Sequence, residues 1–354
     1  MEAFVYIPLA GRVVFGTGTI ARVAAEVEAL GCRHAFILSD LHHATGAALR
    51  VRDVLGNRAV ALSTEAAMHT PVEVTEKVLR DVVRAEADCL VALGGGSTTG
   101  LGKALALRTD LPQVVIPTTY AGSEATPILG QTEGGRKTTI RSAKVLPETV
   151  IYDVDLTLGL PARLSVVSGL NAIAHAVEAL YAKDANPVTS MLAERGIEAI
   201  AQALARIVRD GRDASARSDA LFGAWACGNC LGTVGMSLHD KLCHVLGGSF
   251  DLPHAETHAV ILPHAVAYNA KAAADALDRV ARVLGSGSAA GGLFDLASAL
   301  GAPTSLREIG FDESMLDEAA RIAVAAPYWN PRPIEESAIR ALLDDALYGR
   351  RPQS

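Results

Sequence analysis

The chain has 354 residues, of which half are hydrophobic and a fifth are charged. This balance excludes a disordered protein, and the length predicts two domains of roughly 150–200 residues each. The net charge is −7, from 39 acidic and 32 basic side chains without a run of lysines or arginines, which argues against a nucleic-acid-binding or anionic-membrane-binding surface.

The N-terminal sequence and the cysteines predict a cytoplasmic protein. No basic segment leads into a long apolar stretch at the N-terminus, so we expect no signal peptide. No apolar run reaches the roughly 18 residues that span a bilayer. The five cysteines are too scattered for a disulfide framework, which fits a reducing compartment. Cys227 and Cys230 form a C-x-x-C motif among apolar and small residues, which we interpret as a buried helix rather than a redox or zinc site.

The first 155 or so residues alternate short β-branched runs with amphipathic stretches. The predicted strands are residues 12–16, 34–40, 59–63, 88–97 and 113–119, and the predicted helices are residues 20–31, 44–56, 72–87 and 98–107. Near-continuous apolar strands that alternate with helices indicate a parallel sheet covered on both faces. We therefore predict a doubly wound dinucleotide-binding α/β domain at residues 1–158, with its ligand at the carboxyl ends of the strands.

The strand patterns stop near Pro161, and the remaining apolar patterns have the helical period of 3.6. The predicted helices are residues 162–182, 187–209, 214–235, 236–248, 264–284, 290–300, 312–325 and 335–348. Pro161, Pro253, Pro263 and residues 327–333 separate these helices. We therefore predict an all-helical domain for substrate binding and catalysis at residues 159–354.

Several glycines and hydroxyl residues follow the predicted strands and indicate a nucleotide site. Glycines between a strand and a helix allow the backbone to approach a pyrophosphate, whose charge the helix N-terminus stabilises. An aspartate at an earlier strand end can accept hydrogen bonds from the adenosine ribose. Taken singly, these residues are also ordinary turn or capping residues. The candidate cofactor-binding residues are Asp40, Gly94, Gly95, Gly96, Ser97, Thr118, Thr119 and Ser123.

Six of the ten histidines gather in the helical half and predict an active site there. They are His175, His239, His244, His254, His258 and His264. His175 lies four residues after Asn171, so the two share one helix face. We interpret His264 as a structural histidine. A buried histidine is often structural, but a cluster of this size favours catalysis or ligand binding.

Taken together, the motifs resemble the iron-containing (group III) alcohol dehydrogenase family over nearly the whole chain. The matching segments are GGGS with Lys103, PTTYAGSEAT at 117–126, SGLNAIAHAVEALYA at 168–182, the stretch 235–264 and NPR at 330–332. The resemblance implies a dinucleotide-binding domain followed by a helical domain, the dehydroquinate synthase-like fold, and a homodimer. It also implies an NAD(P)H-dependent oxidoreductase.

Three departures from the family pattern bear on the chemistry. Metal-using members carry an aspartate where this chain has Asn171, which is a neutral and weaker ligand. The spacing from His239 to His244 is one residue longer than usual, and Gly100 replaces an aspartate after GGGS. This combination resembles the branch of the family that reduces maleylacetate to 3-oxoadipate in aromatic-compound degradation. It implies that no metal is required.

Within this interpretation we assign roles to individual residues. His244, the family's histidine nearest the nicotinamide, is expected to be the acid or electrophile. His175, His239 and His254 are expected to bind carboxylate or ketone oxygens in place of the ion. The substrate is a small dicarboxylate, and the remaining candidates for binding it are Asn171, Lys241, Arg332 and Tyr120. Lys137 matches a family lysine that reaches the cofactor ribose or the substrate.

Two questions stay open at this level. Asp40 would repel a 2′-phosphate and favours NADH, while Ser39 beside it leaves room for NADPH. The first rival function is a metal-dependent alcohol or polyol dehydrogenase, for which Asn171 or Asp240 would supply the missing ligand. The second rival is an inactive nucleotide-binding sensor, which would have no need of the histidines.

Overall fold

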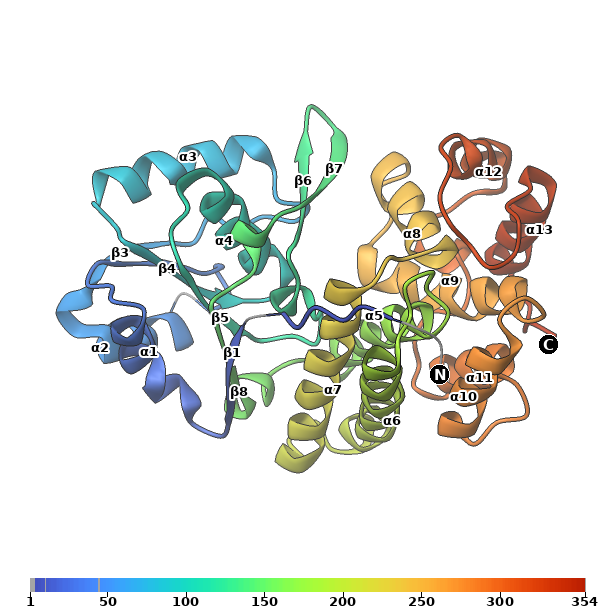
Figure 1. Ribbon diagram of the computed structural model, residues 1–354, viewed down its shortest axis with the longest axis horizontal. Helices are drawn as coiled ribbons and strands as arrows, with labels where there is room; N and C mark the ends of the chain where they lie inside the picture. The colour runs from blue at the N-terminus through green and yellow to red at the C-terminus, as the bar shows by residue number, and fades with distance from the viewer. Residues whose placement is uncertain (1–3, 10, 44, 354) are drawn as a thin grey trace. The chain divides into compact units, whose positions relative to one another are not determined.

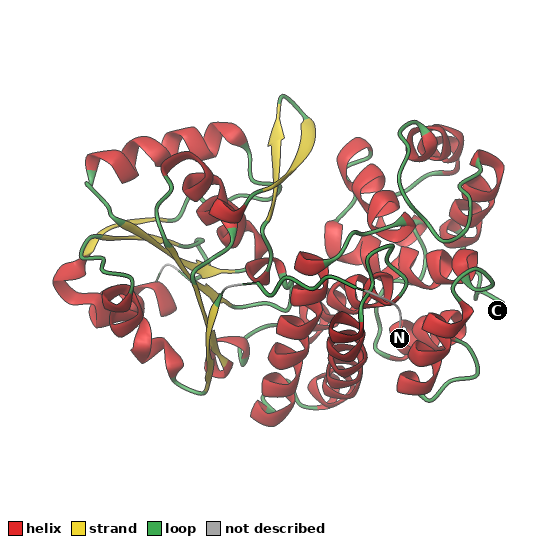
Figure 2. Ribbon diagram, viewed as in Figure 1, coloured by secondary structure: helices red, strands yellow, loops and turns green. Residues whose placement is uncertain are grey.

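The structure, a computed structural model, describes residues 4–9, 11–43 and 45–353, without the side chains of residues 136 and 137. Its contacts divide the chain into two compact units. One unit is Pro8–Leu160, and the other starts at Pro161 and includes the residues before Pro8. Strands are confined to the first unit among the described residues, and the second consists of helices and loops (Figure 2). This confirms the predicted order of an α/β domain followed by a helical domain.

The first unit is built on a six-stranded parallel sheet in the order β1-β8-β5-β4-β2-β3 (Figure 1). Its strands are β1 (Arg12–Gly16), β2 (Ala35–Leu38), β3 (Ala59–Ser63), β4 (Cys89–Gly94), β5 (Gln113–Pro117) and β8 (Thr149–Asp153). The strands β2, β4, β5 and β8 are buried along their whole length, as expected for a parallel sheet covered on both faces.

Helices cover both faces of this sheet. They are α1 (Val23–Ala29), α2 (Ala47–Leu55), α3 (Val72–Arg84) and α4 (Gly96–Thr109). Side chains alternate along β4, so that Val91 and Leu93 pack with α1 and α2 while Leu90 and Ala92 pack with α3 and α4. The predicted doubly wound arrangement is therefore confirmed.

Three strands of the first unit are not among those predicted. One is β8, a five-residue strand whose sheet neighbours β1 and β5 are distant in sequence. The others are β6 (Ile128–Glu133) and β7 (Arg136–Arg141), which form an antiparallel hairpin around Gly134 and Gly135. Both glycines have positive φ angles, as this tight turn requires. The hairpin is too polar for its strands to produce an apolar pattern.

The second unit packs nine α-helices in the described part of the chain. They are α5 (Ala162–Leu180), α6 (Pro187–Arg209), α7 (Ala214–Thr233), α8 (Leu238–Ser249), α9 (His254–Asn269), α10 (Ala274–Leu284), α11 (Ala289–Ala299), α12 (Leu316–Val324) and α13 (Glu336–Leu347). Every residue of α5 from Ser165 to Leu180 is buried, so this helix forms the core of the unit. None of the helices among these residues has the length and apolar character needed to cross a membrane.

Glycines allow α6 and α7 to approach closely beside α5. A Cβ atom on Gly196 would lie 2.7 Å from the Cys227 sulfur, and one on Gly223 would lie 2.5 Å from the Ile200 side chain. Cys227 and Cys230 are both fully buried in α7. Burial raises the pKa of both thiols. The C-x-x-C motif therefore lies within a tightly packed helix, as predicted.

The start of α9 differs from the sequence prediction. Pro263 was expected to separate two segments, with a helix from residue 264 to residue 284, but it lies inside α9. A proline removes one backbone donor from a helix, and that loss can be offset when the surrounding helix is well packed. Twelve residues of α9 are buried. As a result, His254 and His258 lie one turn apart on the same helix.

Candidate active site

The carboxyl ends of β2, β4 and β5 bring the predicted nucleotide-binding residues together. Gly94, at the end of β4, has a φ angle of 156°, and a Cβ atom there would lie 2.3 Å from Thr98 Oγ1 and 3.1 Å from Asp40 Oδ2. A Cβ atom on Gly95 would lie 3.1 Å from Thr119 Cγ2. The glycines are therefore required for this close approach, and α4 begins at Gly96 directly beside it. This geometry fits an anion at the N-terminus of α4.

Unpartnered hydroxyl groups support a ligand at this place. Thr98 Oγ1 and Ser123 Oγ are buried and lack a hydrogen-bond partner among the described residues. Buried polar atoms in proteins are nearly always satisfied, often by a ligand or water. The donors and the glycine turn therefore fit the phosphate oxygens of a dinucleotide.

The buried side chain of Lys103 fixes the loop that follows β5. It lies on α4 and is 1% exposed. Its ammonium group donates hydrogen bonds to the backbone oxygens of Ser123 at 2.5 Å, Thr126 at 2.7 Å and Ile128 at 2.8 Å. Burial lowers the pKa of Lys103 to about 7, and the carboxylate of Glu124 acts in the opposite direction. The oxygen acceptors also favour the charged form, which fastens the loop that carries Thr118, Thr119 and Ser123 to α4.

The presence of glycine at position 100, where the family has an aspartate, has a steric reason. A Cβ atom at this position of α4 would lie 2.3 Å from Thr70 Oγ1. Thr70 has a φ angle of 47°, which is uncommon for a threonine. The turn before α3 therefore fills the space that a side chain at position 100 would need.

The other residues predicted for cofactor or substrate in the first unit differ in exposure. Gly96 is exposed, Ser97 is half-buried, and Thr118 is buried. Tyr120 is one of the largest fully buried side chains. Lys137 lies in β7, and its side chain is outside the described part of the structure.

Four histidines of the helical unit form one cluster centred on His258. The centre of its ring lies 4.4 Å from that of His254, 4.8 Å from that of His239 and 5.3 Å from that of His175. His258 is fully buried, and neither of its ring nitrogens has a hydrogen-bond partner among the described residues. His258 was not among the predicted catalytic residues, although its position four residues after His254 places both on one helix face.

The two faces of α8 separate the histidines that this helix carries. His239 Nε2 donates to the backbone oxygen of His258 at 3.1 Å and lies 3.5 Å from the Cys243 sulfur, so its ring is buried. Asp240 Oδ1 lies 3.5 Å from His244 Nε2, on the partly exposed face. Since Asp240 and His244 are one helical turn apart, they face the same way, whereas His239 and His244 do not.

Glu178 fixes the start of α8 relative to α5. It lies on α5 three residues after His175 and is fully buried. Its carboxylate accepts backbone hydrogen bonds from Ser237 at 2.9 Å, His239 at 2.9 Å and Asp240 at 3.2 Å. These are donors that the first turn of a helix leaves unsatisfied. Glu178 therefore couples the helix of Asn171 and His175 to the helix of Asp240 and His244.

Burial keeps most of the cluster neutral. It lowers the pKa of His175 and of His239 to about 4, and it lowers the pKa of His258 well below its usual range. Burial alone would raise the pKa of Asp240, but the surrounding histidines, of which His244 acts most strongly, lower it overall. The site therefore contains several neutral imidazoles around one ionised carboxylate.

The same residues fit a divalent cation. Ligand atoms of His175, Asp240 and His258 all lie within 4.8 Å of one another, as do those of His239, Cys243 and His258. Two imidazoles and a carboxylate are a common ligand set for Fe²⁺. Asn171 Oδ1 is also buried without a hydrogen-bond partner among the described residues. Asp240 thus offers the negative charge that Asn171 cannot.

The predicted substrate-binding cations of the helical unit lie near aromatic rings. The Lys241 ammonium lies 6.0 Å from the ring centre of Tyr328. The Arg332 guanidinium lies 4.0 Å from the ring centre of Tyr268 and donates to the backbone oxygen of Tyr268 at 3.3 Å. Arg332 therefore holds its own loop against α9.

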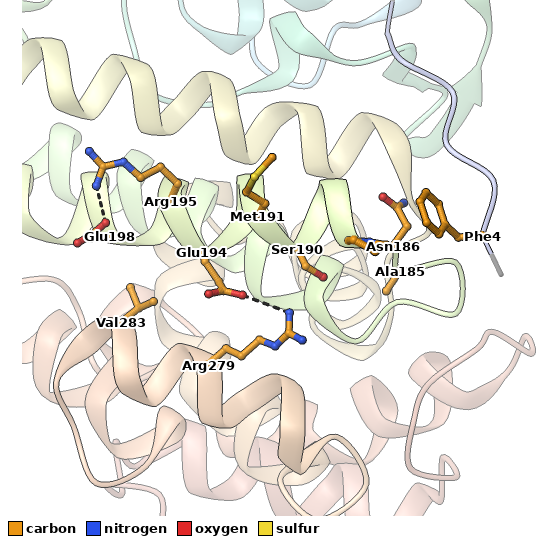
Figure 3. Close-up of a pocket in the computed structure, with 11 residues that line it drawn as sticks. Phe4, Ala185, Asn186, Ser190, Met191, Glu194, Arg195, Glu198, Arg279 and Val283 are labelled. Carbon is orange, nitrogen blue, oxygen red and sulfur yellow. Dashed lines mark hydrogen bonds and ion pairs between the residues drawn. The ribbon is translucent and has the colours of Figure 1, made fainter. Parts of the chain in front are cut away.

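A cavity of about 850 Å³ lies elsewhere in the helical unit, along α6 and α10. Its lining includes Phe4, Met191 and the ion pair between Arg279 and Glu194 at 3.2 Å, and Arg195 pairs with Glu198 beside it (Figure 3). None of the predicted site residues lines this cavity. Because both arginines are paired with glutamates, the groove offers no free positive charge to a carboxylate substrate.

Comparison with known proteins places the chain in a family. Residues 10–154 match the iron-containing alcohol dehydrogenase family, and residues 165–347 match the C-terminal part of the Fe-containing alcohol dehydrogenase family. The chain belongs to the iron-containing alcohol dehydrogenase family. It is therefore an oxidoreductase that uses NAD(P)H.

Relatives with high identity are maleylacetate reductases. The chain is 56% identical to the maleylacetate reductase of Rhizobium sp. (strain MTP-10005) over 100% of both chains. It is 54% identical to that of Burkholderia cepacia, over 99% of this chain and 100% of the relative. The crystal structure of maleylacetate reductase from Agrobacterium tumefaciens matches with a TM-score of 0.96 and 56% identity, over 99% of this chain and 100% of that one.

Proposed function

We propose that this protein reduces maleylacetate to 3-oxoadipate with NADH or NADPH. The observation that carries this proposal is the buried histidine cluster centred on His258, in a chain that is 56% identical over its full length to a maleylacetate reductase. The glycine turn at the end of β4 and the loop held by Lys103 support the nucleotide site. We also propose a homodimer, as the family resemblance implies, and a cytoplasmic location, which the scattered cysteines favour.

The substrate has a C=C bond conjugated to a ketone and carries two carboxylates. When bound, the reduced nicotinamide supplies a hydride to the carbon β to the ketone. Negative charge then develops on the ketone oxygen, and the α carbon needs a proton. A side chain that donates a hydrogen bond or a proton to this oxygen stabilises the enolate.

His244 is suited to this role. It is partly exposed on α8, and its Nε2 atom lies 3.5 Å from Oδ1 of Asp240. The protonated ring can donate to the enolate oxygen, while the pair with Asp240 sets its orientation. His175 and His254, from α5 and α9, supply ring N–H donors for carboxylate oxygens. The buried ring of His239 packs against His258 and so supports the cluster.

We propose that the reaction needs no metal ion. Asn171 replaces the charged ligand of metal-using members, and Asp240 already pairs with His244. A divalent cation held by His175, Asp240 and His258 would polarise the ketone oxygen instead. That cluster favours a second candidate function, a metal-dependent alcohol dehydrogenase.

One experiment separates the two candidates. NADH oxidation is measured with maleylacetate and with a panel of simple ketones and aldehydes, before and after chelation, alongside metal analysis of the purified protein. We expect turnover of maleylacetate alone, unchanged by chelation, without stoichiometric metal. Turnover of simple carbonyls that is lost on chelation would establish the alcohol dehydrogenase. Binding of NADH without any turnover would indicate a nucleotide sensor.

A further inference from the structure

The carboxylate of Asp40 is hydrogen-bonded to His43 in this structure. It follows β2, and its Oδ2 atom lies beside Gly94 at the glycine turn. Both of its carboxylate oxygens contact the ring of His43, whose Nδ1 atom lies 2.9 Å from Oδ1 and 3.0 Å from Oδ2. The backbone N–H of His43 also donates to Oδ1 at 3.0 Å. Because a carboxylate only accepts hydrogen bonds, this contact places a proton on Nδ1.

We propose that His43 allows this site to accept a 2′-phosphate, and so sets the balance between NADPH and NADH. This inference rests on the nucleotide-binding function proposed above. An aspartate at the end of this strand normally binds the ribose hydroxyls of NADH and repels the phosphate of NADPH. The imidazole occupies lone pairs of Asp40 and, when protonated, offsets its charge.

Ser39, the other residue that was expected to leave room for NADPH, is not accessible to the nucleotide. Ser39 is fully buried, and its hydroxyl donates to the backbone oxygen of Leu93 at 3.1 Å. It therefore faces the sheet rather than the nucleotide. In the described part of the chain, no lysine or arginine forms an ion pair with Asp40. The side chains of His43 and Asp40 are 20% and 29% exposed, so a nucleotide can reach the pair.

The strength of the pair sets the size of the expected effect. A partly exposed contact between an imidazole and a carboxylate is worth up to about 1 kcal/mol, which corresponds to about a five-fold change in an equilibrium constant. Without His43, the full charge of Asp40 acts on the 2′-phosphate, while the lone pairs that the imidazole occupied become free for the ribose hydroxyls of NADH. NADPH should then bind more weakly, and NADH should bind as well as before or better.

The test is fluorescence titration of the full-length protein with NADH and with NADPH, in the absence of substrate. In His43→Ala, we expect the ratio of the Kd for NADPH to the Kd for NADH to rise about five-fold. In the Asp40→Asn background, the same substitution should leave the ratio unchanged, because no charge remains to be offset. The matched control is His34→Ala, at the opposite end of β2, which should not alter the ratio.

The outcomes discriminate between the inference and the function on which it rests. An unchanged or lower ratio in His43→Ala, with NADH still binding, overturns the role of His43 alone. Failure of the wild-type protein to bind either nucleotide overturns the proposed function and the inference together. If His43→Ala does not fold, His43→Asn replaces it, since its amide keeps a donor for Asp40 without the charge. The ratio should then rise less than five-fold but remain above that of the wild type.

Discussion

Asp240 and His244 form a pair on α8, with 3.5 Å between Oδ1 and Nε2. The ring of the neighbouring His239 is fully buried and donates to the backbone oxygen of His258. The unusual spacing between His239 and His244 is therefore not a distortion of one site. This spacing separates the buried ring of His239 from the partly exposed ring of His244, the proposed acid. It also leaves the carboxylate of Asp240 one turn before His244.

The first prediction concerns this pair. His244→Ala should lower kcat for maleylacetate reduction by about 10²-fold or more, because general acid catalysis typically contributes that much. Asp240→Asn should lower it by about tenfold, since the amide cannot stabilise the imidazolium. Steady-state kinetics with both nucleotide and substrate varied would check this. The control is Asp278→Asn at an exposed position of α10, which should leave kcat unchanged. Equal kcat values in wild type and His244→Ala would contradict the role assigned to His244.

The second prediction concerns Glu178, which we regard as a positioning residue. Burial raises the pKa of Glu178 to about 7, against three backbone hydrogen bonds that favour the carboxylate. Glu178→Gln replaces one acceptor oxygen by an amide group that cannot accept. We expect a loss of about 1–3 kcal/mol of stability and a lower kcat, with the Kd for NADH unchanged. A merely structural role would lower the melting temperature without a change in kcat at temperatures where the variant is folded.

Lys103 provides the third prediction. Lys103→Met removes the ammonium that holds the oxygens of Ser123, Thr126 and Ile128, so the nucleotide loop should become mobile. We expect the Kd for NADH to rise about tenfold or more, while kcat at saturating NADH changes less. As a control, Lys77→Met at an exposed position of α3 should change neither the Kd for NADH nor kcat. Tight NADH binding by Lys103→Met would show that the loop needs no such support.

The fourth prediction concerns the pH dependence of stability. His264 is buried in α9, where burial lowers its pKa to about 4, although Asp345 acts in the opposite direction. The unfolded state binds this proton below its ordinary pKa of 6.5, so stability is complete above that pH and is lost as the pH falls towards 4. His264→Gln should reduce the slope of unfolding free energy against pH in this window by about 1.4 kcal/mol per pH unit.

Urea unfolding at a series of pH values between 6.5 and 4 would measure this slope. The comparison is between slopes, so a general loss of stability in the variant does not obscure the result. The exposed His34→Gln serves as the matched control. An identical slope in wild type and His264→Gln would mean that this ring takes up a proton equally in the folded and unfolded states.

Local patterns were sufficient for most of the secondary structure. The helix α6 was predicted from its apolar period with the bounds observed, and the structure shows its first turn fixed by Pro187 and by Asn186, which caps the helix together with Thr189. The apolar run before Gly94 likewise predicted β4 and the turn that follows it. Where tertiary packing outweighed local preference, as with Pro263 inside α9, the prediction was wrong.

The sequence by itself determined the family, the two-part fold, and the residue types available for the chemistry. The tertiary structure decided how these residues are paired. His43 on Asp40, Glu178 on the start of α8, and Asp240 with His244 depend on which helix face or loop turns inward. Burial keeps His175 and His258 neutral, whereas the pKa of Asp240, which burial alone would raise, is lowered above all by His244. Spacing alone allows the Asp40–His43 and Asp240–His244 pairs, which lie within one helical turn in the chain. The contact of Glu178 with the start of α8 and the burial of the histidines cannot be obtained from spacing, because they depend on segments that are distant in the chain.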